Sequence, residues 1–148
     1  MRRPPIRQAD YAALAEFRYL IRRFLEFSEK EARLVGLTPR QHQALLAIKG
    51  LGGAGPVSIG DLAERLCIRH HSAVELVNRL AEKELVERIT DSADHRRILL
   101  GLCPKGEASL AELSAAHLNE LSRIRPMLRR VLDREEEDPD SSTRSRRE

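Results

Sequence analysis

The sequence predicts a mainly α-helical protein of the α+β class with one small β-hairpin. Amphipathic helices are indicated where apolar residues recur every three or four positions, at residues 10–35, 38–50 and 58–83 and again beyond residue 104. Residues 85–90 and 97–102 are instead rich in Val, Ile, Leu and Thr, and they flank a polar connection, as in a hairpin. The length of 148 residues suits one domain with a modest core.

Two short helices are predicted between residues 58 and 83. Ser58 can cap the first, and Asp61 favours the positive end of that helix. After a turn at residues 67–69, a second helix runs from about residue 70 to residue 83 and places an apolar stripe on one side. Its opposite face is polar, and such a face suits insertion into the major groove of DNA.

The connection between the two predicted strands concentrates charge at the hairpin tip. Arg96 and Arg97 follow Asp94, whose carboxylate can hold an arginine extended through a charge-assisted hydrogen bond. An extended arginine fits the narrow minor groove, where the negative potential of DNA is deepest. Residues 38–103 therefore have the layout of a winged helix-turn-helix.

The motifs of this region resemble the DNA-binding core of the MarR family of bacterial transcriptional regulators. LAERL, RHHSAVELVNRL, LVER and a D-H-R-R wing followed by LCPKG occur in the family's order and spacing. The resemblance implies that residues 69–79 supply the major-groove helix, that Asp94 and Arg96 form the acid-x-arginine pair of the wing, and that Pro104 begins the next helix. The sequence departs from the family at Cys67, Glu75 and Cys103, where a small turn residue, a basic residue and Thr are usual.

We predict three groups of DNA contacts. The recognition helix is expected to contribute Arg69, His70, His71, Ser72, Val74, Glu75, Asn78 and Arg79. The wing is expected to contribute Asp94, His95, Arg96 and Arg97, and the DNA backbone is expected to meet Ser58 and Arg40.

Four of these residues have alternative readings. A histidine at position 70 or 71 either donates to a phosphate or base edge or is simply solvated. Val74 either touches a thymine methyl or packs against the wing, and Glu75 either accepts from cytosine N4 or repels mispositioned phosphates.

A long amphipathic helix is predicted near each chain end, at residues 10–35 and 104–134. Both apolar faces are wider than one small domain can bury, which favours a homodimer with intertwined termini, and the family resemblance implies the same assembly. Pro126 is expected to kink the second helix or split it in two. The polar ends, residues 1–8 and 135–148, are expected to be flexible tails of this single chain.

The resemblance also implies an effector site between the first, second and fifth helices. A small aromatic or carboxylate effector is expected to meet Phe17, Tyr19, Phe24, His42 and His117. Arg18, Arg22 or Arg23 would supply a positive charge for a carboxylate. The alternative for the two histidines is a structural role, as satisfied histidines of the core.

Several classes of protein are disfavoured. Lys and Arg number 26 against 23 Asp and Glu, which gives a net charge of +3. Bulk basicity therefore does not indicate DNA binding, and the prediction of a DNA-binding protein depends on where the charges lie. The sequence contains neither the roughly 20 apolar residues of a membrane span nor a signal peptide, and we expect a cytoplasmic protein. It lacks nucleotide-binding and hydrolase motifs, and neither the adjacent histidines nor the two cysteines have metal-ligand spacing, so we expect no enzyme, no metal and no cofactor.

We therefore predict a sequence-specific regulator of transcription that binds double-stranded DNA. It would be a dimeric repressor, released from a pseudo-palindromic operator by a small molecule. One alternative is a thiol-based redox sensor acting through Cys67 or Cys103. The other is a winged-helix module for protein interaction, without an operator.

Overall fold

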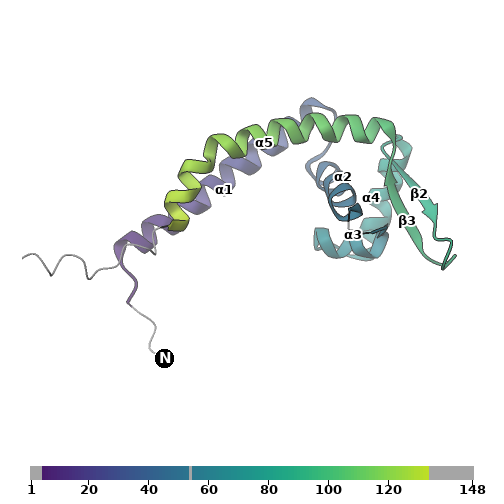
Figure 1. Ribbon diagram of the computed structural model, residues 1–148, viewed down its shortest axis with the longest axis horizontal. Coiled ribbons are helices and arrows are strands. Elements are labelled where there is room, and N and C mark those ends of the chain that lie inside the picture. Colours follow the sequence, from purple (N-terminus) through teal and green to yellow (C-terminus); the bar gives the residue numbers. More distant parts are fainter. Residues whose placement is uncertain (1–4, 54, 134–148) are drawn as a thin grey trace, which may run out of the picture. The chain divides into compact units, whose positions relative to one another are not determined.

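The computed structural model describes residues 5–53 and 55–133. These form five helices and three short strands (Figure 1). The elements are α1 (Gln8–Leu34), α2 (Pro39–Gly52), β1 (Val57–Ser58), α3 (Ile59–Leu66), α4 (His70–Glu82), β2 (Val86–Thr90), β3 (Ile98–Leu102) and α5 (Pro104–Leu132). The predicted mainly α-helical α+β class is confirmed.

The chain divides into two compact units, which we describe separately. The winged-helix unit is Ser28–His117. The helical unit consists, within the described residues, of 5–27 and 118–133. The helices α1 and α5 each contribute to both units.

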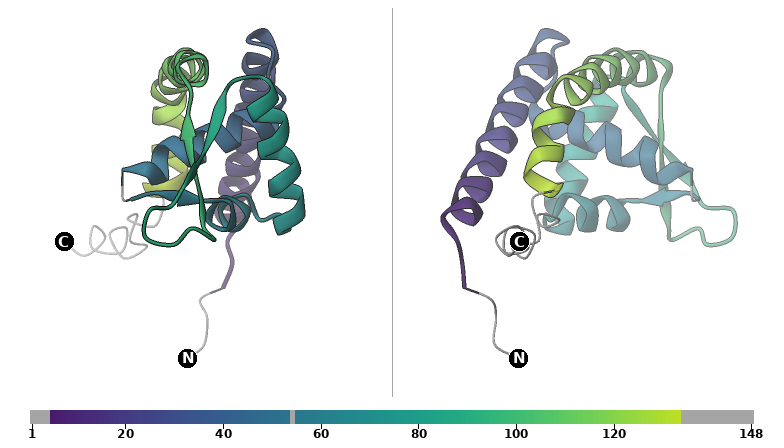
Figure 2. Two further views of the ribbon diagram at one scale, coloured as in Figure 1. Left: turned by 90° about the vertical axis from the view of Figure 1, so that its right-hand side faces the viewer. Right: turned by 60° about the vertical axis from the view of Figure 1, so that its left-hand side comes forward.

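The sheet of the winged-helix unit is antiparallel, in the order β1-β3-β2. Arg88 of β2 and Val57 of β1 both pair with Leu100 of β3. The β2–β3 hairpin extends away from the helices of its own unit, with its loop outermost (Figures 1 and 2). The sequence predicted the hairpin but not β1, because two residues are too few to produce a recognisable alternation.

The core of this unit is made by helix faces that the sequence patterns anticipated. Buried side chains from α2, α3, α4, the hairpin and α5 form one cluster. The largest fully buried members are Leu45, Leu62, Val77, Leu80, Leu85 and Leu113. This packing fixes the position of α4, since its apolar stripe faces the cluster.

The first turn of α5 closely approaches Leu85, the residue that precedes β2. Leu85 O accepts a hydrogen bond from the Cys103 amide at 3.0 Å. A Cβ atom at Gly106 would overlap with that same carbonyl group. Only glycine therefore lets α5 start at this distance from the base of the hairpin.

Local sequence signals set the start of α2. Gly36 adopts a left-handed φ of 78° after α1, as a residue without Cβ can do at little cost. Thr38 and Gln41 then form a capping box, with Gln41 N donating to Thr38 Oγ1 at 3.1 Å and Thr38 N donating to Gln41 Oε1 at 3.0 Å. Two side chains three positions apart thus satisfy backbone amide groups at the start of α2.

In the helical unit, α1 and α5 run side by side (Figure 1). Leu20 and Ile124 are buried there. Many other large apolar side chains of the two helices remain exposed: Tyr11, Leu14, Phe17, Tyr19, Ile21, Leu25, Leu118, Leu121 and Leu132. One chain thus covers only a narrow part of the apolar faces.

Two expectations for the chain ends need correction. Pro126 does not split the last helix, because α5 continues through it to Leu132. The helix α1 begins at Gln8, inside the predicted tail, and Asp10 Oδ2 accepts from the Arg7 amide at 2.7 Å. Residues 1–4 and 135–148 of the predicted tails lie outside the described residues.

Candidate nucleic-acid interface

The helix-turn-helix begins with a capping box at the start of α3. Ser58 Oγ accepts from the Asp61 amide at 3.1 Å, and Asp61 Oδ2 accepts from the Ser58 amide at 2.9 Å. Ser58, predicted to meet the DNA backbone, is half-buried and has its oxygen engaged in this cap. Arg40, the other backbone candidate, is exposed in the first turn of α2.

The turn between α3 and α4 depends on an unusual backbone conformation. Cys67 has a left-handed conformation with φ 53° and ψ 43°, and its amide donates back to α3. Glycine adopts this conformation more readily than cysteine, which explains why a small residue is usual at such a turn. Arg69 then serves as the N-cap residue of α4 without a side-chain capping bond.

The predicted phase of the recognition helix α4 is confirmed. Ala73, Leu76, Val77 and Leu80 are buried. The exposed candidates are Arg69, His70, His71, Glu75, Asn78 and Arg79, whereas Ser72 and Val74 are half-buried. Val74 packs against the core cluster, which favours a packing role over a thymine contact.

One exposed residue of α4 has a partner in the hairpin. Asn78 Oδ1 accepts a hydrogen bond from Arg88 Nη2 of β2. The sequence analysis missed Arg88, because its partner is determined by the packing of β2 against α4. The only feature of the sequence that could have indicated Arg88 was a cationic side chain in a strand next to the recognition helix.

The wing tip is held by bonds among its own residues. Asp94 Oδ1 accepts from the Arg96 amide at 3.1 Å and from Arg96 Nε at 3.3 Å. Asp91 Oδ1 accepts from the Ala93 amide at 2.9 Å, and Asp94 O accepts from the Arg97 amide at 2.9 Å. The predicted Asp94–Arg96 contact is therefore present, and the Arg96 side chain is 94% exposed.

Arg97 differs from its neighbour. Its Nη2 atom lies 3.4 Å from Asp61 Oδ2, so the side chain is bound to the first turn of α3. The pKa of Asp61 is lowered by its hydrogen bonds with Ser58 and further by Arg97. The predicted anchoring of an arginine by Asp94 thus holds for Arg96 alone. His95, between these two residues in the sequence, is exposed.

The residues predicted for an effector site fall in the two different units. Phe17 and Tyr19 are exposed and Phe24 is half-buried, and all three belong to the helical unit. His42 and His117 belong to the winged-helix unit. The expected effector site thus stays a prediction.

The two histidines form a pair within the winged-helix unit. His42 is 4% exposed, and its ring centroid lies 4.8 Å from that of His117. His117 Nδ1 donates to Leu113 O at 2.6 Å, and its Nε2 lies 2.8 Å from Ser28 Oγ. Burial and, second, the neighbouring His117 lower the pKa of His42. These contacts support the structural alternative for both residues.

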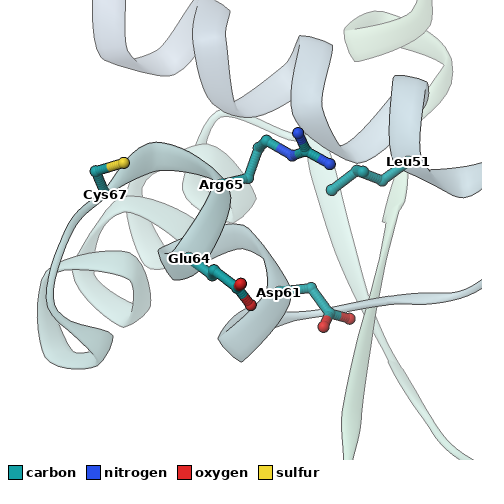
Figure 3. Close-up of a pocket in the computed structure, with 5 residues that line it drawn as sticks. All are labelled: Leu51, Asp61, Glu64, Arg65 and Cys67. Carbon is teal, nitrogen blue, oxygen red and sulfur yellow. The ribbon is translucent and has the colours of Figure 1, made fainter. Parts of the chain in front are cut away.

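A cavity of about 400 Å³ lies beside α3 (Figure 3). Leu51, Asp61, Glu64, Arg65 and Cys67 line it, with the Arg65 side chain reaching toward Leu51. Both cysteines are free thiols: Cys67 is exposed, and Cys103 is half-buried. Burial and the nearby Glu87 and Glu84 raise the pKa of Cys103.

Within residues 5–53 and 55–133, no group of three His, Cys, Asp or Glu side chains could hold a metal ion. No helix in the same ranges is long and apolar enough to cross a membrane.

Comparison with known proteins agrees with this architecture. Residues 35–98 match the model of the MarR family. The chain is 31% identical over 77 residues to the uncharacterized HTH-type transcriptional regulator YsmB of Bacillus subtilis, covering 52% of this chain and 51% of YsmB. It is 28% identical over 99 residues to the HTH-type transcriptional repressor MdtR of the same species, covering 67% of this chain and 59% of MdtR.

The chain spans little more than half the length of these curated relatives. Both are named as transcriptional regulators, in agreement with the expectation that the chain is not an enzyme.

Solved structures share the fold. A MarR family protein from Bacillus stearothermophilus gives a TM-score of 0.68 at 21% identity, over 81% of this chain and 82% of that one. A mutant of MepR from S. aureus, bound to an oligodeoxyribonucleotide, gives 0.64 at 18% identity, over 84% and 88%. The motifs, the family model and the fold thus agree, and residues 35–98 of this chain match the MarR family of winged helix-turn-helix proteins.

Proposed function

We propose that the protein is a transcriptional regulator that binds double-stranded DNA in a sequence-specific manner, in the cytoplasm. The observation that carries this proposal is the exposed polar face of α4, presented next to a wing whose Arg96 is held outward by Asp94. A helix of this kind enters the major groove, while an extended arginine can occupy the minor groove. The fold shared with a DNA-bound MepR mutant supports the same assignment.

A titration with salt tests this proposal most directly. Binding of a labelled duplex should weaken steeply as salt rises, because each phosphate contact releases counterions. An affinity for the duplex that does not change with salt, or the absence of binding in low salt, would instead favour the alternative of a winged-helix module for protein interaction.

We further propose that the regulator acts as a homodimeric repressor on a pseudo-palindromic operator. The exposed apolar side chains of α1 and α5 in the helical unit are the supporting observation, since such a surface is unusual for a monomer. The occupant would be a second copy of the same helices, related by a two-fold axis. Two recognition helices related in this way read half-sites about one helical turn apart.

Sedimentation and operator selection test the dimer separately from DNA binding. Leu14→Glu and Leu118→Glu each place a charge on an exposed apolar position of this surface. They should shift the protein toward the monomer and weaken binding to paired half-sites more than to one half-site. Glu16→Gln on α1, which is exposed but not apolar, is the control.

Release by a small aromatic or carboxylate effector is the last part of the proposal. Its candidate contacts remain Phe17, Tyr19, Phe24, His42 and His117. For release, it is enough that the effector binds the state that does not bind DNA more tightly than the DNA-binding state, by about 1–3 kcal/mol. Salicylate at high concentration should lower operator affinity, and Phe24→Ala should blunt that response. Parallel loss of dimer and DNA binding in this variant, without any ligand dependence, would exclude it as an effector contact.

A redox response is the second candidate, because Cys67 is exposed at the turn that places α4. Oxidation of a thiol there would add bulk beside the recognition helix. Peroxide should then reduce DNA binding of the wild type and of Cys103→Ser, but not of Cys67→Ser. Equal sensitivity of all three proteins would exclude this mechanism.

A further inference from the structure

Glu75 lies on the side of α4 that is turned furthest from the core. The buried stripe of the helix consists of Ala73, Leu76, Val77 and Leu80. At about 100° per residue, His71, Glu75 and Asn78 lie within roughly 30° of the direction opposite this stripe, and we call these three exposed residues the outer line of α4. Arg79, by contrast, lies about 70° to one side of that direction.

This placement decides which part of a DNA groove Glu75 can meet. A recognition helix in the major groove has base edges in front of it, at the floor of the groove, and phosphates at either side. The outer line faces the floor, whereas a residue on the flank such as Arg79 faces a wall. Glu75 also belongs to the second turn of α4, and the N-terminal part of a recognition helix contacts the bases. The geometry therefore favours a base contact over repulsion of a phosphate.

The carboxylate of Glu75 is free to accept a hydrogen bond from DNA. Among the residues that the structure describes, none bonds to it. Asn78, the next residue of the outer line, already bonds to Arg88 of β2. A carboxylate that enters a groove loses water and then needs a donor, because an unpaired buried charge is costly. Glu75 must therefore find this donor on the DNA.

Few groups in the major groove can donate to a carboxylate. An ionised carboxylate has only acceptors. Guanine offers N7 and O6 and thymine offers O4, which are acceptors as well, whereas cytosine N4 and adenine N6 are donors. Adenine places the acceptor N7 beside N6, but cytosine has no acceptor of its own in this groove. Cytosine is thus the best match for Glu75, adenine is a weaker one, and guanine and thymine oppose the carboxylate.

We propose that Glu75 is a specificity-determining residue that selects a cytosine at one position of the bound sequence, by accepting from its N4 amino group. Where this cytosine is absent, the carboxylate stays unpaired and binding is weaker. The inference rests on the proposed DNA-binding function. It concerns which sequence is preferred and not the ability to bind DNA.

Selection of bound sequences from random duplexes tests the inference, after thermal melts have shown that each variant folds. The wild type should select a cytosine at one position for which Glu75→Ala has no preference. In the wild type, thymine in place of that cytosine should weaken binding roughly five- to a hundredfold, as for one base contact. Glu75→Gln should instead move the preference toward adenine, because an amide can accept from N6 while it donates to N7.

Glu82→Gln is the matched control for the loss of a negative charge. Glu82 is exposed and is the last residue of α4, beyond the part of the helix that contacts bases. Both glutamine variants should bind all duplexes more tightly, because each removes a charge that the phosphates repel. Only Glu75→Gln should change the selected base.

A modified duplex tests the hydrogen bond itself. A pyrimidinone base without the exocyclic amino group, in place of the selected cytosine, removes the donor. The wild type should bind this duplex roughly five- to a hundredfold more weakly than the unmodified one. Glu75→Ala should bind both duplexes equally, which corrects for any effect on the duplex alone. An equal loss for the two proteins would overturn the inference, because the amino group would then act independently of Glu75.

Two other results would also overturn the inference. One is wild-type selection of any base other than cytosine at the position where Glu75→Ala loses its preference. The other is tighter binding of Glu75→Ala to all sequences with unchanged base preferences, which would make Glu75 a residue that repels phosphates. If the wild type selects no sequence at all, the proposed function fails as well, and the two failures are thereby distinguished.

Discussion

Arg97 Nη2 lies 3.4 Å from Asp61 Oδ2, which joins the loop of the wing to the first turn of α3. The preceding residue, Arg96, instead bonds to Asp94 at the tip. Two adjacent arginines thus have different partners and different surroundings. We expect mutations at these two positions to have different consequences.

The first prediction concerns Arg96. Arg96→Ala should weaken binding across many sequences and lower the salt slope by about one, because the side chain contributes mainly sequence-independent electrostatics. Fluorescence anisotropy at several salt concentrations measures both quantities. Arg97→Ala is the matched control: it should change the slope less and lower the free energy of unfolding by about 0.2–1 kcal/mol, as for an exposed ion pair. Identical effects of the two variants would contradict the distinction.

The second prediction concerns the two faces of α4. Leu76→Ala should lower the free energy of unfolding by about 2–5 kcal/mol, because it leaves a cavity in the core. Replacement of the exposed Glu75 or Arg79, or of the half-buried Ser72, should instead alter base preference, by about 1–3 kcal/mol for each lost contact. Urea denaturation and operator selection measure these effects. The assigned phase of α4 would be wrong if Leu76→Ala were harmless and Arg79→Ala changed neither affinity nor operator.

The third prediction concerns the close approach of α5 to Leu85, the residue that precedes β2. Gly106→Ala should destabilise the fold by about 1–3 kcal/mol, because the new Cβ overlaps with the Leu85 carbonyl and the backbone must shift. Gly50→Ala in α2 is the control, since nothing lies within 4 Å of its Cβ position. That variant should be neutral or stabilising by up to about 1 kcal/mol. Equal melting temperatures for the two variants would refute the packing argument.

The fourth prediction concerns the pH dependence of stability. Because the pKa of His42 is lowered in the folded state, the unfolded state binds a proton more readily. Stability from this residue is present above its ordinary pKa of 6.5 and declines as pH falls from there toward the folded-state pKa. Chemical denaturation at pH 7.5 and pH 5.5 measures the decline.

Two variants isolate the contribution of His42. His42→Gln, which does not titrate, should show a smaller difference between the two pH values. His71→Gln at an exposed position should retain the wild-type dependence. Unchanged pH dependence in His42→Gln would assign the decline to other groups.

The sequence predicted those features that depend on neighbours along the chain. Periodicity identified the buried face of α4, and Ser58 followed by Asp61 identified the start of α3. The contact of Asp94 with Arg96 was predictable for the same reason, since the two residues are only two positions apart.

Features that depend on packing between elements were not predictable in this way. The partners of Arg88 and Arg97 are set by how the hairpin packs against α4 and α3. The strand β1 consists of two residues that acquire their conformation by pairing with β3. Pro126 was expected to kink α5 or split it in two, and the split does not occur, because helix continues on both sides of the proline and the surrounding turns offset the lost hydrogen bond.

The bonds of the wing tip also bear on the entropy of DNA binding. A free arginine loses considerable rotamer freedom when a ligand immobilises it, at a cost of about 1.5–2 kcal/mol. Arg96 is already restrained by Asp94, within a loop closed by its own backbone bonds. Much of that ordering therefore takes place when the chain folds, and the wing is preorganised before any duplex arrives.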